Sequence, residues 1–452
     1  MPNKARALAT SVAALTVLTL AACSTTNGQP GAAVEPQLGP GAQTVAPAPQ
    51  PDPGAEPVHI TYLHRLPNGE GMVQVEDIVA RWNAANPNIQ VTSEQFSGAS
   101  ADMTLRLETD IQAGVGPCLA QIGYGEVPDV FVRGMLMDVT PYAEQFRNNF
   151  SPGAWAMMNV GGQQIGIPQD VGPLIYMYNA TAFEELGLEV PTNMEEFIAA
   201  SRIAREHGRY LSFWGVGQQH ALSAQAAAAG DVWFSAVDDQ WHVDTFGPGT
   251  QRVAEFWQTL IDEDLTLDGS AGGDTVTVAM ANGTLIGRIA AGWEVGFSLN
   301  AVDGTPYEGQ WRVALLPDFG AGRMTGPNGG SGVAVMAGCD HPAEAMAFNN
   351  WFNTQIDDLA TQGLIVAANG EVETPANIAR QFGGQDVMAV LAEATQDLNP
   401  NFVYAPGFAT LVIMNQVGAA ARAGEVPVSE IFLTAQTTAV DALRDLGLPV
   451  AD

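Results

Sequence analysis

Ser331 has some of the surroundings of a catalytic nucleophile, because glycines flank it in the segment "PNGGSGVAV" at 327–335. A serine nucleophile of the G-x-S-x-G type needs a glycine two residues further on, and Val333 stands there instead. We therefore interpret this segment first as a backbone turn. Gly330 and Ser331 remain candidates for hydrogen bonding to a ligand.

Lysine is almost absent, since Lys4 is the only one in the sequence. Without a further lysine the chain has no Walker A motif, no Schiff-base lysine and no kinase lysine. The six histidines show neither the H-E-x-x-H pattern nor the Cys/His spacing of metal sites. We expect no catalytic residues, no cofactor and no metal.

The N-terminus has the pattern of an exported lipoprotein. Lys4 and Arg6 precede an apolar run, residues 7–20, that is shorter than the roughly 20 residues of a membrane-spanning helix. The order Leu-Ala-Ala-Cys at 20–23 resembles the bacterial lipobox, which implies cleavage of residues 1–22 and acylation of Cys23. The alternative is an ordinary cleavage site with an incidental cysteine.

The segment that follows has the composition of a tether. It is rich in Ser, Thr, Gly, Ala, Pro, Gln and Asn and has no apolar periodicity, so it cannot build a core. We expect residues 23–57 to form a lipid anchor and flexible tether that holds the folded body at the outer face of the cell membrane. An untethered N-terminus is the alternative.

Charge and size limit the partners and the architecture. The formal net charge is −32, and removing Lys4 and Arg6 with the signal peptide makes it −34, so phosphate backbones are repelled and we expect no nucleic acid partner. The chain is 46% hydrophobic, which is enough for a core. The nearly 400 residues that follow the signal peptide and tether are too many for one domain, so two lobes are expected.

The first patterned segments alternate between strand and helix. Strands are predicted at 59–64, 89–96 and 118–125, with helices at 75–86 and 103–114 between them. This order predicts a parallel α/β sheet. Further helices are predicted at 181–187, 193–208, 249–265 and 342–355.

The order of these landmarks resembles the bacterial extracellular solute-binding proteins of the carbohydrate-uptake class, the maltose-binding-protein-like family of ABC transporters. The resemblance runs over nearly the whole mature chain. It rests on "WNAANPNIQV" at 82–91, "IGIPQDVGPLIYMYN" at 165–179, "FEELGLEVPTNMEEF" at 183–197, "IAAGWEVGF" at 289–297, "VALLPDFG" at 313–320 and "GGSGVAVMAGCDHPAEAMAFNNWFNT" at 329–354.

The resemblance implies an α/β fold with two lobes, a hinge and a ligand cleft between the lobes, the periplasmic-binding-protein-like fold. Residues 58–168 and the return segment 312–354 would form lobe 1, and residues 169–311 with the C-terminal helical part, 355–452, mainly lobe 2. The chain would cross near 168–173 and again near 311–317. A hinge there would let the lobes close on a ligand.

A sugar has hydroxyls at its edge and apolar C–H faces, so a site for it combines carboxylates or amides with flat aromatic rings. Residues of these types fall where the family's cleft loops are expected. The candidate ligand-binding residues are Trp293, Asp170, Tyr124, Trp214, Glu126, Glu294, Arg65, Ser331 and Tyr404.

Each candidate also has a structural interpretation, and for Trp214 the cleft and the core are equally supported. Trp293 is assigned to the cleft because Gly292 and Gly296 open space around it. Tyr124 and Asp170 are assigned to it because ligands bind at strand ends in α/β sheets. Apolar helical faces place Trp82, Trp257 and Trp351 in the core, and at least one of Tyr176 and Tyr178 should be buried.

With Cys23 acylated, Cys118 and Cys339 remain as an even pair in an oxidising compartment. Both fall in the predicted lobe 1. We expect a disulfide between them, with two buried thiols as the alternative.

The sequence thus predicts a lipid-anchored, monomeric receptor that captures a sugar or oligosaccharide outside the cell, delivers it to an ABC permease and catalyses nothing. One alternative is a secreted carbohydrate-active hydrolase, in which Asp170 and Glu294 would serve as the two carboxylates. Another is the same fold with a polyol, glycerophosphodiester or peptide as ligand.

Overall fold

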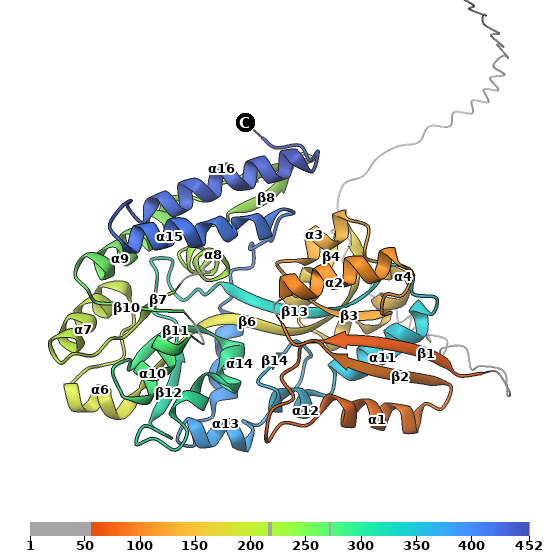
Figure 1. Cartoon of the computed structure of the whole chain (residues 1–452), viewed down its shortest axis with the longest axis horizontal. Coiled ribbons are helices and arrows are strands. Elements are labelled where there is room, and N and C mark those ends of the chain that lie inside the picture. Colours follow the sequence, from red (N-terminus) through yellow and green to blue (C-terminus); the bar gives the residue numbers. More distant parts are fainter. Residues whose placement is uncertain (1–55, 99, 216–218, 271–272, 452) are drawn as a thin grey trace, which may run out of the picture. The chain divides into compact units, whose positions relative to one another are not determined.

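Strand β6 (Gly166–Asn179) is the element that connects the two halves of the main sheet. The computed structural model describes residues 56–98, 100–215, 219–270 and 273–451, all within one compact unit (Figure 1). Cys23, the predicted signal peptide and nearly all of the predicted tether lie outside the described residues.

The first half of the sheet is built around a parallel core. Strand β1 (Val58–His64) pairs in parallel with β2 (Ile89–Gln95) and β3 (Leu119–Gly123). Strand β13 (Pro327–Val335) runs antiparallel between β3 and the first part of β6. The predicted alternation of strand and helix over residues 58–123 is confirmed.

The second part of β6 lies between two antiparallel neighbours, β11 (Gly287–Ala291) and β12 (Trp311–Leu315). Short strand β14 (Ile365–Val366) pairs with β6 at Val171 and Asp170. Because β12 pairs with the same residues of β6 as β11, the chain returns towards β3 through β13 and not near 311–317. The residue bounds of the two lobes stay a prediction.

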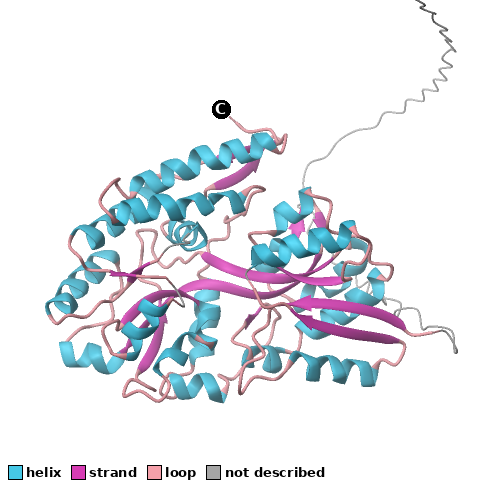
Figure 2. Ribbon diagram, in the orientation of Figure 1, coloured by secondary structure: helices cyan, strands magenta, loops and turns pink. Residues whose placement is uncertain are grey.

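Helices cover both faces of the sheet, so each strand alternates its side chains between two cores (Figure 2). In β6, Ile167, Ile175 and Met177 belong to one core and Tyr176 to the other. Helix α1 (Val75–Ala85) packs into the core that contains Ile167 and Ile175, and α2 (Ser100–Gln112) packs into the core that contains Tyr176. The α/β fold class is therefore confirmed.

The remaining helices have the bounds α3 (Val127–Val132), α4 (Thr140–Ala143), α5 (Pro152–Met157), α6 (Ala180–Leu186), α7 (Met194–Glu206), α8 (Gln219–Ala228), α9 (Pro248–Asp262), α10 (Asp274–Ala281), α11 (Pro342–Asn353), α12 (Ile356–Thr361), α13 (Ala376–Gln381), α14 (Val387–Gln396), α15 (Met414–Arg422) and α16 (Ser429–Asp445). The 3-10 helices are η1 (Glu144–Asn149), η2 (Gly292–Gly296), η3 (Ser298–Val302) and η4 (Phe408–Ile413). The remaining strands are β4 (Asn159–Val160), β5 (Gln163–Gln164), β7 (Phe213–Trp214), β8 (Phe234–Val237), β9 (Gln240–Val243) and β10 (Leu267–Asp268). No helix among the described residues is both long and apolar enough to cross a membrane.

Local sequence explains where several helices begin. The side chain of Asn179 accepts a hydrogen bond from the Ala182 amide at the start of α6, 2.9 Å away. Asn193 caps α7 in the same way through the Glu196 amide, also at 2.9 Å. Proline occupies the first helical position of α9 and α11, where its missing N–H costs no hydrogen bond.

The tryptophans predicted to be core residues are buried or half-buried. Trp82 and Trp257 are buried, and half-buried Trp351 packs on Trp82 with ring centroids 5.3 Å apart. Tyr176 is fully buried and Tyr178 half-buried, in agreement with the expectation for that pair.

Cys118 and Cys339 are joined by a disulfide, with their Cα atoms 4.7 Å apart. The pairing follows from the sheet, because Cys118 precedes β3 and Cys339 follows β13, its antiparallel neighbour. The bond links positions separated by 221 residues in sequence.

Candidate ligand-binding site

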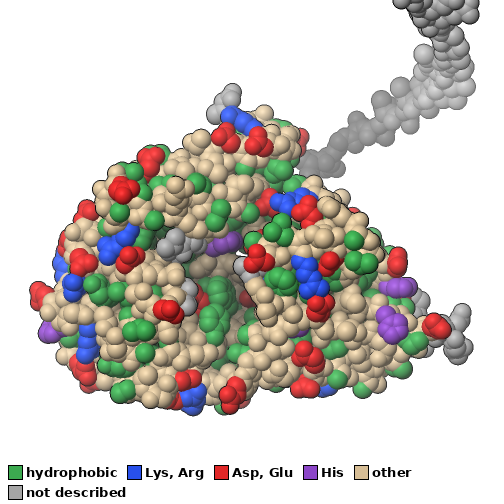
Figure 3. Space-filling view, in the orientation of Figure 1, with side chains coloured by type: hydrophobic (Ala, Val, Ile, Leu, Met, Phe, Trp, Pro, Cys, Tyr) green, Lys and Arg blue, Asp and Glu red, His purple; other side chains and the backbone are tan. Residues whose placement is uncertain are grey.

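A cavity of about 570 Å³ opens among the end of β3, the inner part of β6 around Asp170, the start of β13, the turn η2 and the start of α8 (Figure 3). This volume is in the usual range for a small-molecule site. Seven of the nine candidate ligand-binding residues line it: Arg65, Tyr124, Glu126, Asp170, Trp293, Glu294 and Ser331. The sheet register thus brings together residues that are far apart in sequence.

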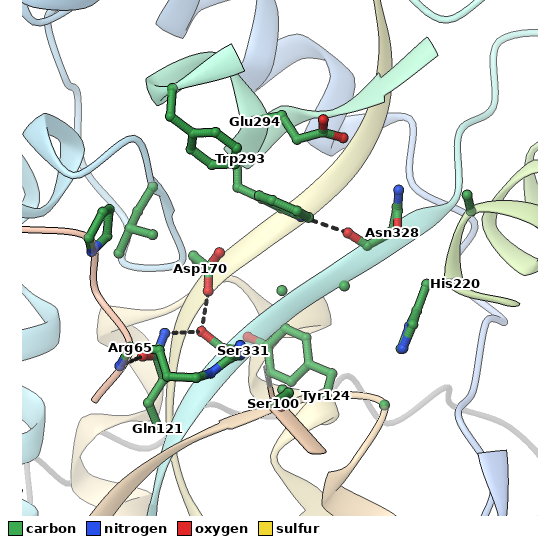
Figure 4. A pocket seen from close by; sticks show the side chains of 18 of the residues that line it. Arg65, Ser100, Gln121, Tyr124, Asp170, His220, Trp293, Glu294, Asn328 and Ser331 are labelled. Carbon is green, nitrogen blue, oxygen red and sulfur yellow. Dashed lines mark hydrogen bonds between the residues drawn. The ribbon is translucent and has the colours of Figure 1, made fainter. Parts of the chain in front are cut away.

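One side of the cavity is a chain of hydrogen-bonded polar groups (Figure 4). The Ser331 hydroxyl donates to Asp170 Oδ1, and Gln121 Nε2 donates to the Ser331 hydroxyl oxygen at 3.0 Å. Gln121 Oε1 accepts from the Arg65 amide at 2.7 Å. Asp170, Gln121 and Ser331 are all buried, so this side is rigid and pre-organised.

Asp170 is the charged centre of this polar side. Its burial raises the pKa of the carboxyl to about 6, although hydrogen bonds from Ser331 and the positive charge of Arg65 partly oppose that rise. A carboxylate held this way can accept hydrogen bonds from ligand hydroxyls.

The opposite side of the cavity is aromatic. Trp293 of η2 and Phe297, which directly follows η2, have ring centroids 5.8 Å apart, and Phe213 also lines the cavity. The indole Nε1 of Trp293 donates to the Asn328 carbonyl at 2.8 Å, which fixes the plane of the ring (Figure 4). An apolar platform therefore lies in the same cavity as the Asp170 carboxylate.

Gly172 keeps space beside this platform. A Cβ at position 172 would lie 3.0 Å from the Trp293 ring and 2.5 Å from the Asn328 carbonyl oxygen. Only glycine lets β6 pass this close to the indole and to β13.

Glu294 lines the cavity, yet its carboxylate already has partners within the protein. It forms a buried ion pair with Arg288, and its Oε1 accepts a hydrogen bond from the Ala291 amide at 2.9 Å. These contacts stabilise the turn that carries Trp293.

Tyr124 and His220 form a third part of the wall. The Tyr124 amide donates to the Gly330 carbonyl at 3.0 Å, while its buried hydroxyl has no hydrogen-bond partner among the residues that the structure describes. His220, at the start of α8, packs on Phe408 with ring centroids 4.9 Å apart. Burial lowers the pKa of its imidazole, which favours the neutral form.

Two candidates do not line the cavity. Trp214 is buried against Trp257, and its Nε1 donates to the Gly418 carbonyl at 3.1 Å, so of the two positions that the sequence left open for it, the structure has the core and not the cleft. Tyr404 is buried behind His220 and donates to the Pro327 carbonyl at 3.2 Å, so it supports the wall from outside the cavity.

Comparison with known proteins identifies the family. The model of the family described as "Bacterial extracellular solute-binding protein" matches residues 67–355. This chain belongs to that family. The expected resemblance and the two-lobed binding-protein fold class are thereby confirmed.

Individual relatives agree with this assignment. The galacto-N-biose-/lacto-N-biose I-binding protein of an ABC transporter from Bifidobacterium longum, solved with lacto-N-biose, is 42% identical, with a TM-score of 0.84 over 88% of this chain and 100% of the other. A transporter-associated binding protein from B. animalis subsp. lactis, solved with β-1,6-galactobiose, shares the fold at 22% identity and a TM-score of 0.72, over 88% of this chain and 100% of the other. An uncharacterized lipoprotein from Streptomyces antibioticus is 24% identical over 311 residues, 66% of this chain and 67% of the other.

For this solute-binding protein, sequence reasoning missed several residues that line the cavity. They include Ser100, Gln121, Phe213, His220, Phe297, Asn328 and Gln362. Gln121 had a usable signal, since it lies in β3 two residues before the strand end that the sequence assigned to the cleft. His220 had none, because it reaches the cavity only through the packing of α8.

The cavity of this solute-binding protein offers hydrogen-bonding groups and apolar rings to a ligand. Among the residues that the structure describes, no group of three or more His, Cys, Asp or Glu side chains could hold a metal ion. Among the described lining residues, Arg65 is the only arginine and there is no lysine. The arrangement suits a polar, uncharged ligand with flat apolar faces.

Proposed function

We propose that this protein captures a small saccharide of the galacto-N-biose and lacto-N-biose I class outside the cell and delivers it to the permease of an ABC transporter. The observation that carries this proposal is the presence of the Trp293 ring and the Asp170 carboxylate in one cavity. Each sugar ring presents an apolar face to the former and hydroxyls to the latter.

The proposed ligand contacts follow from the two kinds of wall in the cavity, one aromatic and one polar. Trp293 stacks on a sugar face, and Asp170, held by the hydrogen bond from Ser331, accepts hydrogen bonds from sugar hydroxyls. Arg65, Tyr124 and Glu126 supply further polar contacts, whereas Glu294 acts through the turn beside Trp293. The 42% identity to the B. longum protein supports the choice of sugar class.

The proposed location is extracytoplasmic. Cys23 carries the lipid anchor, the tether follows it, and the body works as a monomer at the outer face of the membrane. The lipobox residues at 20–23 and the lipoprotein relative from S. antibioticus support this location.

We propose that the protein is not an enzyme. A hydrolase would need two free carboxylates on opposite sides of a glycosidic bond. The Glu294 carboxylate is ion-paired with Arg288 and accepts a hydrogen bond from the Ala291 amide, and these contacts weigh against a role as general acid. Membership in a solute-binding family points the same way.

A thermal-shift screen tests the proposal. Lacto-N-biose I and galacto-N-biose are compared with maltose, glycerol, a glycerophosphodiester and a short peptide. A ligand at 100 times its dissociation constant stabilises by about 2.7 kcal/mol, so binding raises the melting temperature measurably. Stabilisation by a non-sugar ligand alone would contradict the sugar assignment, and breakdown products in the same samples would contradict the absence of catalysis.

A further inference from the structure

The aromatic side of the cavity is built on a buried arginine that does not itself line the cavity. Arg288 lies in β11, and its guanidinium forms the ion pair with Glu294. Its guanidinium carbon also lies 5.2 Å from the centroid of the Phe213 ring, within the range of a cation–π contact. Glu294 and Phe213 both line the cavity, so Arg288 holds two parts of its wall from behind.

The turn between β11 and Phe297 transmits this contact to Trp293. Glu294 directly follows Trp293 in η2, and its second contact, the Ala291 amide, lies at the end of β11. Gly292 and Gly296 let the turn approach Ile365 and Gly363 closely, since a Cβ at either glycine would lie at most 2.5 Å from these neighbours. The backbone on both sides of Trp293 is therefore anchored.

Trp293 has one further anchor, the hydrogen bond from its indole to the Asn328 carbonyl. That bond fixes the ring end of the side chain, while the ion pair fixes the backbone end. Loss of the ion pair would leave a buried charge without its partner and allow the turn to shift.

We propose that Arg288 is a positioning residue for ligand binding, acting through Glu294 and Phe213 to hold Trp293 and the aromatic platform in the orientation that stacks on the ligand. The inference rests on the proposed function, in which Trp293 contacts a sugar. It assigns to Glu294 a role inside the protein and not at the ligand.

The competing role for Glu294 makes the opposite prediction. If Glu294 accepted hydrogen bonds from the ligand, Arg288→Met would free its carboxylate, and affinity would stay equal or rise. If Arg288 positions the platform, Arg288→Met weakens binding although it touches no ligand atom.

The experiment measures binding of lacto-N-biose I by calorimetry to the full chain, to Arg288→Met and to Arg312→Met. Arg312 is a matched control, because it lies in β12 on the other side of β6 and its guanidinium donates to the carbonyls of Gly309 and Trp311. We expect Arg288→Met to lose affinity about tenfold or more, as for an interface anchor, and Arg312→Met to change it by less than about twofold. Unchanged or tighter binding by folded Arg288→Met would overturn the inference.

Two further arms separate positioning from general destabilisation. In the Trp293→Ala background, Arg288→Met should lower the affinity for lacto-N-biose I by less than about twofold, because the side chain that Arg288 positions is already absent. A full tenfold further loss would contradict action through Trp293. If Arg288→Met does not fold, Arg288→Met/Glu294→Gln removes both buried charges and is expected to show the same loss of affinity, whereas parental affinity in that variant would overturn the inference.

A ligand-free arm keeps the test independent of the proposed function. The emission of Trp293 is obtained by subtracting the spectrum of a matched Trp293→Phe variant, with and without Arg288→Met. We expect this difference spectrum to change in Arg288→Met and not in Arg312→Met. Failure of the parent to bind any sugar would sink the proposed function alone, while an unchanged Trp293 spectrum in Arg288→Met would sink the positioning role.

Discussion

The hydroxyl of Ser331 in β13 donates a hydrogen bond to the carboxyl of Asp170 in β6, and 161 residues separate the two in sequence. They are register partners in neighbouring antiparallel strands, at a point where the ladder is irregular. Gln121 of β3 donates to the same hydroxyl oxygen, so three strands contribute to one polar group. This group faces the Trp293 platform across the cavity (Figure 4).

Trp293→Ala is expected to weaken binding of lacto-N-biose I at least tenfold. The substitution removes a large apolar platform, and anchors of this kind typically contribute about 2 to 4 kcal/mol. Calorimetry measures the affinity, and the melting temperature reports folding. Unchanged affinity would remove the stacking role, and an unfolded variant would return Trp293 to the core.

Trp214→Ala provides the matched control for a buried tryptophan away from the cavity. It should destabilise the fold by about 3 to 5 kcal/mol, because it leaves a void beside Trp257 and an unpaired Gly418 carbonyl. The folded Trp214→Ala variant should bind lacto-N-biose I with nearly the affinity of the parent.

Asp170→Asn is expected to weaken binding while leaving the protein folded. The amide keeps the shape of the side chain but loses charge-assisted hydrogen bonds, each of which is worth about 1.5 to 3 kcal/mol. Titration of the ligand at pH 7.5, where the parent carboxyl is largely ionised, measures the effect. Parental affinity in this variant would remove Asp170 from the proposed ligand contacts.

The raised pKa of Asp170 also predicts a pH dependence of stability. Burial raises this pKa to about 6, against about 3.9 in an unfolded chain, so the folded protein binds the proton more tightly. The contribution to stability is fully present below pH 4 and is lost as the pH rises through about 6, on the order of 2 to 3 kcal/mol.

Urea unfolding between pH 4 and pH 7 checks this dependence. Asp170→Asn cannot ionise, so its stability relative to the parent should increase from pH 4 to pH 7. Parallel profiles for the two proteins would show that the carboxyl does not titrate in this window.

The Cys118–Cys339 bond is expected in the exported protein. Intact mass should increase by two hydrogens on reduction, and thiols that titrate in the native, unreduced protein would contradict the bond. Closing a loop of 221 residues contributes about 5 kcal/mol in the chain-entropy model, so Cys118→Ser/Cys339→Ser should unfold at clearly lower urea concentration.

Cys23→Ser is expected to release the protein from the membrane fraction. Without the thiol no lipid can be attached, and the apolar run before residue 23 is too short to span a bilayer. Fractionation of cells that express the variant and the parent measures the difference. A variant as firmly bound as the parent would show that the anchor lies elsewhere.

Much of the fold was predictable from local pattern. The alternation in residues 59–64, the apolar face of Val75, Ile78, Val79 and Trp82, and the Asn-Pro pair at 86–87 are local features, and the structure has β1 and α1 there. Strand ends also indicated Tyr124 and Asp170 as residues near a ligand, and both line the cavity.

The sequence by itself determined which segments are strands and helices, because hydrophobic periodicity is a property of neighbouring residues. Only the tertiary structure decided that Trp214 belongs to the core, that Tyr404 stands behind His220, and that Glu294 pairs with Arg288. The physical reason is that a side chain's partner depends on strand register and helix packing between distant segments. A tryptophan or a carboxylate has the same local pattern whether it faces a ligand or a buried partner.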